Sequence, residues 1–230
     1  MLSVEEALKK ILSEFYVLEP TSVHLGESIG MVTSEDVFSD LDIPPTDNSA
    51  MDGYAVFSKD IKKATPENPV FLHVISTIAA GEVSSLAISP GTAIRIMTGA
   101  PIPEGADSVV PFEETTEMDH EASDSTDQIG IKISLPPKTY IRNRGSDINN
   151  LDKVISSGTK LTPPVIGVLA SLGHTHVKVY RRPVISVLAT GNELIDPGSK
   201  LMPGKIYDSN TSGLVAAIKS CGATPREVGM

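Results

Sequence analysis

The stretch PPTDNSAMDGYAV, residues 44–56, separates two parts of the chain and leads into a strand. Each proline pushes the preceding residue toward extended backbone and lacks a backbone donor, so we expect a domain boundary near Ile43. Asp52 lies at the mouth of the predicted strand. On spacing alone these polar residues are typical of Asx turns, with a tight turn at Asp52–Gly53. The alternative is a carboxylate at Asp52 that is available to a cation or a hydroxyl-rich ligand.

After this stretch, short apolar runs separated by Gly, Pro and Asn continue to about Lys138, which indicates a small β-domain. The predicted strands are 54–57, 70–78, 92–97, 108–111 and 129–135. Residues 113–127 of this domain are acidic and rich in Ser and Thr. That composition favours a solvated hairpin excursion over a metal-binding acidic patch.

The chain before the two prolines begins with an amphipathic helix over 3–15, where Ser3 and Glu6 are spaced as a capping box. The next expected elements are strands at 21–25 and 31–37, with a helical turn at 27–30 between them. After the β-domain we expect a helix at 163–172, ended by Gly173, and a strand at 177–180.

From Val184 onward the pattern is that of an α/β unit, in which a strand is followed by a helix and another strand. The expected elements are a buried strand at 184–189, a turn at 190–193, a helix at 210–221 and a strand at 226–229. The sequence therefore predicts an α+β fold with several domains.

The composition fits a globular protein and excludes several classes of partner. Of 230 residues, 40% are hydrophobic and 21% charged, both typical of folded domains. The net charge of −10 disfavours nucleic-acid binding, which needs clustered cations. The single cysteine excludes an internal disulfide framework, and no apolar segment approaches the length of a membrane span. We therefore expect a soluble, cytoplasmic protein without membrane insertion.

Two further segments of the middle region carry polar side chains that chemistry could use. The loop at 97–107 offers Thr98 and small residues that let backbone N–H groups approach an anion, although a plain loop between strands is the simpler interpretation. The segment 142–147 places two arginines beside Asp147. Arginines bind phosphate bidentately, but a surface ion-pair cluster fits this segment equally well.

The α/β unit offers two more polar segments. Gly191 and Glu193 follow the predicted strand at its carboxyl end, where open α/β sheets bind ligands. Asp208, Ser209 and Asn210 directly precede or begin the predicted helix. They could form an ordinary N-cap, or the helix N-terminus could bind phosphate while Asp208 holds Mg²⁺.

The five histidines lack metal-ligand spacing, and His174 and His176 are expected on a surface strand. The phosphate loop of P-loop NTPases, the Rossmann fingerprint, the serine-hydrolase elbow and the HExxH motif are all absent from the sequence. These absences argue against the four corresponding reaction types.

Five motifs in order resemble the motif series of the molybdopterin molybdenumtransferase family, which includes bacterial molybdenum-insertion proteins and the E domain of gephyrin. They are DNSAMDGYAV at 47–56, MTGAPIPEGADSVV at 97–110, RNRGSDI at 142–148, ATGNEL at 189–194 and PGKIYDSN at 203–210. The series extends over most of the chain, and its specificity comes from the order of the five motifs.

The resemblance implies an elongated homodimer of four-domain subunits. Residues 1–43 and 140–180 would form a split first domain with helices and strands. Residues 44–139 would form an inserted β-domain, and 181–230 would begin an α/β molybdopterin-binding domain. The family's Gly-Gly-x-Ser-x-Gly segment and its C-terminal barrel would lie after Met230, so we expect this chain to be inactive alone.

The implied reaction is Mg²⁺-dependent insertion of molybdate into adenylylated molybdopterin, with release of AMP. The resemblance assigns catalytic positions to Asp52, Thr98, Asp147 and Glu193. It assigns substrate-binding positions to Gly191, Ser209 and Asn210, and a metal position to Asp208. A different class of function is a catalytically inactive dimerisation or scaffold module.

Overall fold

The computed structural model describes residues 2–118 and 127–229, so residues 119–126 of the predicted acidic excursion lie outside the described residues. The chain forms two compact units, each described here by itself. The sheet unit comprises Ser39–Asp152, and the split unit comprises Met1–Phe38 together with Lys153–Met230.

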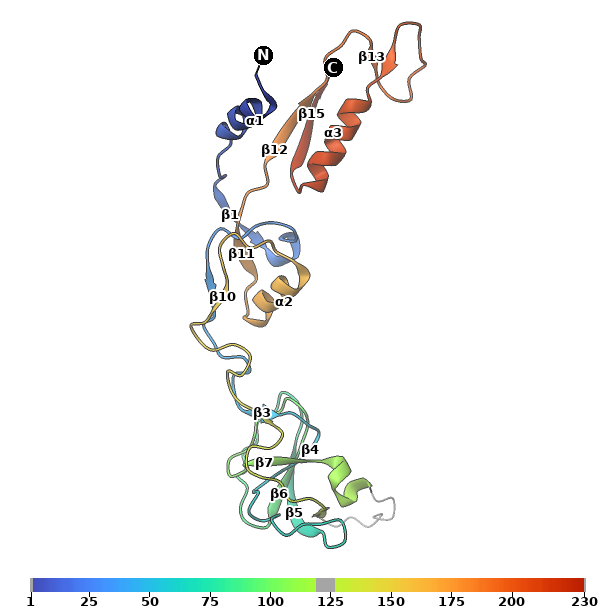
Figure 1. The fold of residues 1–230 in the computed structure, drawn as a ribbon. Coiled ribbons are helices and arrows are strands. Elements are labelled where there is room, and N and C mark those ends of the chain that lie inside the picture. Colours follow the sequence, from blue (N-terminus) through green and yellow to red (C-terminus); the bar gives the residue numbers. More distant parts are fainter. Residues whose placement is uncertain (1, 119–126, 230) are drawn as a thin grey trace. The chain divides into compact units, whose positions relative to one another are not determined.

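The sheet unit is built on five strands in the order β7-β4-β6-β5-β8 (Figure 1). The strands are β4 (Gly53–Val56), β5 (Val70–Ile78), β6 (Thr92–Ile96), β7 (Ser108–Pro111) and β8 (Gln128–Ile131). Strands β5 and β6 are parallel, and the other neighbours are antiparallel. The predictions of β5 and β7 are confirmed with the same bounds, whereas β8 ends earlier than the predicted 129–135.

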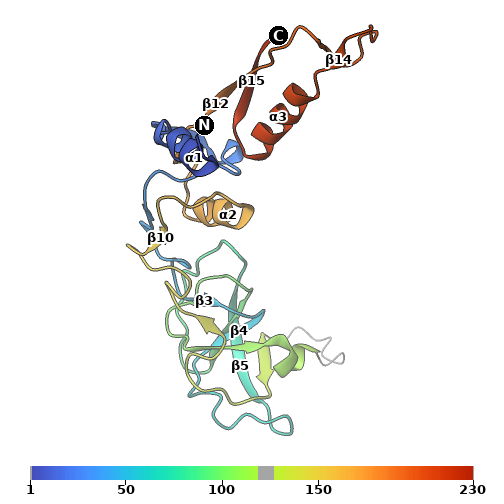
Figure 2. The ribbon, with the colours of Figure 1, turned by 45° about the horizontal axis from the view of Figure 1, so that its top comes forward.

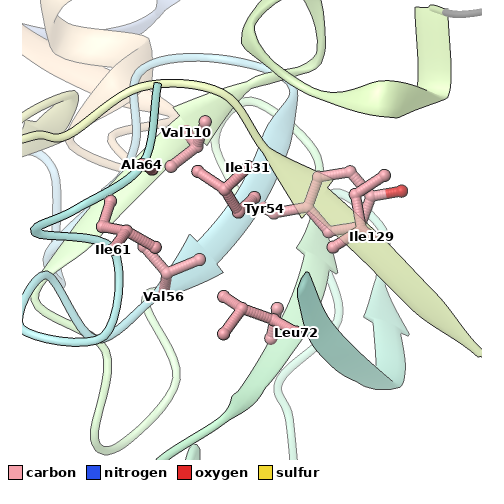
Figure 3. Packing of buried hydrophobic residues seen from close by; sticks show 9 residues of the cluster. Tyr54, Val56, Ile61, Ala64, Leu72, Val110, Ile129 and Ile131 are labelled. Atoms are coloured by element: carbon pink, nitrogen blue, oxygen red, sulfur yellow. The ribbon is translucent and has the colours of Figure 1, made fainter. Parts of the chain in front are cut away.

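Apolar side chains cover both faces of this sheet. Tyr54 and Val56 pack in one cluster with Leu72, which Figure 3 shows, whereas Ala55 packs in a second cluster with Ile94. Side chains alternate between the two faces of a strand, so burial of both faces leaves every residue of β4 buried.

Gly53 is the position at which β4 and β7 approach most closely. A Cβ built on Gly53 would lie 1.9 Å from the carbonyl oxygen of Val110. No side chain fits there without moving the backbone of β7. Gly53 is therefore the first residue of a strand rather than part of the predicted tight turn.

Two connecting segments of the sheet unit pair with each other. Strand β3 (Asn48–Ser49) is antiparallel to β9 (Ile141–Arg142), and Ile43 forms a bridge to Ile148. The sheet unit accordingly includes segments on both sides of the predicted 44–139. The predicted boundaries of the three domains stay predictions.

The segment that follows β7 forms two short turns of 3-10 helix. These are η2 (Phe112–Glu114) and η3 (Thr116–Met118). The expectation of a solvated excursion from residue 113 is therefore wrong for the described part, because Glu117 there makes hydrogen bonds to side chains of the sheet.

The split unit joins the two ends of the chain. Its elements before the sheet unit are α1 (Val4–Ser13), β1 (Pro20–His24), η1 (Leu25–Glu27) and β2 (Val37–Phe38). After it come β10 (Lys153–Ile155), α2 (Pro163–Ser171) and β11 (His176–Tyr180). Strands β1 and β11 are antiparallel, as are β2 and β10. The capping box of Ser3 and Glu6 is confirmed.

One apolar cluster of the split unit draws on both stretches of sequence. Leu25 and Met31 from the first stretch pack with Leu161, Leu169 and Val179 from the second. The predicted strand at 31–37 is wrong except near its end. Val32 and Thr33 form isolated bridges instead of a ladder.

The last part of the chain has the predicted strand, helix and strand. Strand β12 (Val184–Leu188) is parallel to β15 (Thr224–Gly229), and α3 (Ser209–Ser220) contacts both of them (Figure 2). Strand β13 (Leu194–Ile195) is parallel to β14 (Ile206–Tyr207).

Strand β12 is not buried as predicted. Val187 is 6% exposed, but Val184 and Leu188 are 62% and 61% exposed. In the described residues this parallel sheet has two strands, and two strands and one helix cannot cover both faces. Among residues 2–118 and 127–229, none of the helices has the length and hydrophobicity of a membrane span.

The close contact at Gly53 makes a testable prediction. Gly53→Ala should destabilise the sheet unit by about 3 kcal/mol, because the new Cβ overlaps a backbone oxygen. Hydrogen exchange of the β4 and β7 amides should then be roughly a hundredfold faster. Gly167→Ala is the control, since nothing lies within 4 Å of a Cβ there. Unchanged β4 exchange in Gly53→Ala would contradict this account of the fold.

Candidate functional site

The structure joins the first two motifs of the sequence through one carboxylate. Oδ1 of Asp52 accepts hydrogen bonds from the backbone N–H of Thr98 at 2.7 Å and from its hydroxyl at 2.8 Å. Both residues are exposed. The backbone N–H of Thr98, followed by its hydroxyl, lowers the pKa of Asp52 below the ordinary value, and burial opposes this only partly. Asp52 is therefore a surface carboxylate that is ionised at neutral pH.

Backbone pairing holds the two segments that carry Asp52 and Thr98. The N–H of Gly99 donates to the carbonyl of Ser49 at 2.9 Å, and the N–H of Ser49 donates to the carbonyl of Ala100 at 2.9 Å. Gly99 has a φ of 83°, a left-handed conformation that glycine adopts without strain. The Asp52–Thr98 pair, predicted on two separate segments, is thus part of one rigid arrangement.

The arginines of the third motif are engaged with carboxylates. Arg142 donates to Asp147 at 2.7 Å, and Arg144 donates to Asp42 at 2.5 Å. The backbone N–H of Arg144 also donates to Asp47 at 2.7 Å. These contacts are those of the surface ion-pair cluster, one of the two interpretations that the sequence left open. In the described residues no hydrogen bond or ion pair joins Asp147 to Asp52 or Thr98.

Asp42 supports this cluster from the chain before the prolines. Its pKa is lowered by a hydrogen bond from the backbone N–H of Asn150 and then by the guanidinium of Arg144. Sequence reasoning missed Asp42, since its partners lie more than a hundred positions away in the chain. No local pattern signals such a contact.

Gly191 and Glu193 follow β12 at its carboxyl end, as predicted. The carboxylate of Glu193 lies directly over Gly191. A Cβ built on Gly191 would be only 2.6 Å from Glu193 Oε1. Both residues are exposed. Their position fits a ligand contact at the end of a parallel strand.

Asp208 is the N-cap of α3, which confirms the capping interpretation. Its side chain accepts a hydrogen bond from the N–H of Thr211 at 3.0 Å, and hydrogen bonds from Thr211 lower its pKa. Asp208 is 5% exposed, whereas Ser209 and Asn210 at the start of the helix are exposed. The pairing of β13 with β14 places this motif beside the one that contains Glu193. The backbone N–H of Ile206 donates to the backbone carbonyl of Glu193 at 2.8 Å.

The donor set fits a magnesium ion only in part. Among the described residues there is no group of three or more His, Cys, Asp or Glu side chains that could hold a metal. Mg²⁺ commonly uses one or two carboxylates and completes its shell with water and substrate phosphate. The ionised carboxylate of Asp208 could provide one such ligand at the N-terminus of α3.

The four histidines among the described residues belong to no group of three or more metal-binding side chains. His176 lies on β11, but His174 precedes that strand, so the prediction that places both on a strand is wrong for His174. His174 has its Nε2 buried without a hydrogen-bond partner, and His176 packs edge-on against His24 at 5.4 Å. His120 lies outside the described residues.

Sequence reasoning also missed a group of side chains next to Asp52. Tyr54, Arg95, Phe112 and Glu117 contact one another through hydrogen bonds and ring contacts. The sequence showed two of them only as members of predicted strands. Their proximity depends on strand register, which no short-range spacing reveals.

A comparison with family models matches residues 2–173 to the MoeA N-terminal region, domains I and II. Among curated proteins, molybdopterin molybdenumtransferase 2 of Mycobacterium tuberculosis is 40% identical over 223 residues, which are 97% of this chain and 53% of that protein. The molybdopterin molybdenumtransferase of Bacillus subtilis is 37% identical over 99% of this chain and 52% of its own length. The chain thus spans about half the length of these relatives.

Solved structures give the same result. A crystal structure of a molybdopterin biosynthesis protein from Pyrococcus horikoshii OT3 has a TM-score of 0.85 at 30% identity. The match covers the whole of this chain and 60% of that one. A second structure from the same species has a TM-score of 0.80 at 32% identity, covering 99% of this chain and 56% of the other. Both structures share with this chain a fold of mixed helices and strands.

The hydrogen bonds of Asp52 predict a pH dependence. A carboxyl group whose pKa is lowered by folding stabilises the fold above its unfolded pKa, about 3.9. That contribution is lost as the pH falls through the lower pKa of the folded state. Thr98→Val removes one donor to Asp52 and should raise its pKa toward the ordinary value. Between roughly pH 5 and pH 2, wild-type protein should therefore lose more stability than Thr98→Val.

Urea unfolding at a series of pH values measures this difference. Thr77→Val on β5 is the matched control and should follow the wild-type pH dependence. Identical pH dependence for Thr98→Val and wild type would rule out a contribution of this hydroxyl to the ionisation of Asp52.

Proposed function

The chain belongs to the MoeA family, and we propose from this premise that it acts in the insertion of molybdate into adenylylated molybdopterin with release of AMP. The relatives named molybdopterin molybdenumtransferase support a role in molybdenum cofactor biosynthesis. The proposal rests on one observation in particular. Asp52 and Thr98, from separate motifs, form an exposed and ionised pair that the backbone holds rigidly.

The proposed role of Asp52 is to orient the ligand at its reacting end. Oδ1 is fixed by Thr98, and in the described residues no hydrogen bond reaches Oδ2. An ionised oxygen with no protein partner can accept a proton or a hydrogen bond from a ligand. The Thr98 hydroxyl donates to Asp52 and can itself accept from the same ligand. Asp147, held by Arg142, completes the proposed catalytic set on the sheet unit.

The proposed role of the α/β part is to bind the anionic end of the pterin. The N-terminus of α3 carries a partial positive charge that favours a phosphate, and Ser209 and Asn210 are exposed there. At the end of β12 the exposed carboxylate of Glu193, which lies over Gly191, would contact the ligand. Mg²⁺, when bound at Asp208, would neutralise phosphate charge. A reducing cytoplasm suits the single exposed cysteine.

An activity assay tests the proposal. Because the chain alone is expected to be inactive, the assay uses the chain joined to the second half of the Bacillus subtilis relative. We expect AMP release and molybdenum incorporation when this fusion protein is mixed with adenylylated molybdopterin, molybdate and Mg²⁺. Asp52→Asn should lower the rate by about a hundredfold or more, because it removes the ionised oxygen without changing the shape. Asp40→Asn is the control, since Asp40 is an exposed carboxylate away from the five motifs.

Two outcomes of this assay would contradict the proposal. Normal turnover by Asp52→Asn would remove Asp52 from the site. A wild-type fusion protein that forms dimers but gives no turnover would instead support the inactive dimerisation module.

We also propose that the chain is a homodimer. Helix α1 has an apolar face of Val4, Leu8, Ile11 and Leu12, and all four side chains are exposed. A capped helix with an uncovered apolar face gains stability by burying that face against another surface. Light scattering should show twice the chain mass for wild type.

Leu8→Glu should reduce the dimer at equal protein concentration, because it places a charge on the apolar face. Ser13→Glu adds the same charge to α1 outside the four apolar positions and should leave the dimer intact. A Leu8→Glu protein that remains fully dimeric would contradict a dimer through α1.

A further inference from the structure

Arg95 lies next to the candidate site and is held on two sides. It stands on β6 directly opposite Tyr54 of β4. Its Nη2 donates to Oε1 of Glu117 at 3.0 Å, and its guanidinium lies over the ring of Phe112, 4.5 Å from the centroid. A planar guanidinium can stack on a ring and donate in its own plane at the same time. The orientation of Arg95 is therefore fixed.

Tyr54, a buried residue of the sheet, also contacts Glu117. Its hydroxyl donates to Oε2 of Glu117 at 2.6 Å, so both carboxylate oxygens of Glu117 accept a hydrogen bond from the sheet. Burial, together with the negative charge of Glu117, raises the pKa of Tyr54. The hydroxyl consequently stays protonated and remains a donor. Tyr54 also packs edge-on against Phe112, with ring centroids 5.9 Å apart.

Phe112 connects these side chains to Asp52. Its backbone N–H donates to the carbonyl oxygen of Asp52 at 3.2 Å, while its ring carries Arg95. One residue thus contacts Arg95 through its ring and Asp52 through its backbone. The positive charge of Arg95 is also near enough to contribute, after the hydrogen bonds of Thr98, to the lowered pKa of Asp52.

We infer that Arg95 is a positioning residue for Asp52, which it holds toward Thr98 by stacking on Phe112 while Glu117 and Tyr54 fix its guanidinium. The inference rests on the proposed role of Asp52 in the ligand site and adds a residue that none of the five motifs singled out. It requires the planar shape of arginine as well as its charge, so lysine cannot replace it.

The backbone N–H of Thr98 is a direct reporter for the test. Because this group donates to Asp52 Oδ1, its NMR chemical shift follows the ionisation of Asp52 as the pH is lowered. Arg95→Lys keeps the charge but loses the planar stack and the fixed hydrogen bond. We expect the midpoint of the Thr98 titration to move upward in Arg95→Lys, and further upward in Arg95→Gln.

A second variant keeps every charge and nearly every atom. Tyr54→Phe removes only the hydroxyl that holds Glu117, and we expect a smaller upward shift of the Thr98 midpoint. If Arg95 acts through its charge alone, both Arg95→Lys and Tyr54→Phe will titrate as wild type, and that result overturns the inference. Should Arg95→Lys fail to fold, the Tyr54→Phe result decides.

Arg226→Lys on β15 is the matched control, since Arg226 donates to Ser186 in the split unit. It should leave the Thr98 titration unchanged, and an equal shift in this variant would overturn the inference. The titration needs no substrate, so its outcome is independent of AMP release. Absence of AMP release by the wild-type protein, together with an upward shift of the Thr98 midpoint in Arg95→Lys, would refute the proposed function and leave the positioning role standing.

Discussion

The pairing of β4 between β6 and β7 is the constraint on which the candidate site depends. Gly53 allows the backbone of β4 to approach Val110 so closely that any larger residue would displace β7. Asp52 directly precedes this contact, and the N–H of Phe112 fixes its carbonyl. The position of one exposed carboxylate is thus set by a buried backbone contact, which packing on both faces of the sheet makes rigid.

Hydrogen bonds and ion pairs of the sheet unit also determine the charge at the candidate site. Thr98 stabilises the ionised form of Asp52 with two hydrogen bonds, whereas Arg142 and Arg144 are occupied by Asp147 and Asp42. At Asp52 and Thr98 the sheet unit therefore presents a negative group, and the two arginines of the third motif are already paired. In the proposed reaction it would orient the ligand, and the start of α3 would bind phosphate.

The local elements could be predicted from the sequence, but the long-range contacts could not. The bounds of β5 and β7 follow from apolar runs between turn residues, and the cap of α1 follows from Ser3 and Glu6. The exposure of β12 was mispredicted, because burial of a strand depends on what covers its two faces. The motif order identified the candidate positions, whereas the Arg95 cluster requires the register of β4 against β6.

The most direct test of the central claim is a ¹⁵N NMR titration of the chain with adenylylated molybdopterin. The account predicts that the amide signals of Asp52, Thr98 and Gly99 shift as the ligand binds. Amides at the opposite end of β6, such as that of Gly91, should remain unchanged. Binding that shifts other amides but leaves those of Asp52 and Thr98 unmoved would contradict the claim that this pair contacts the ligand.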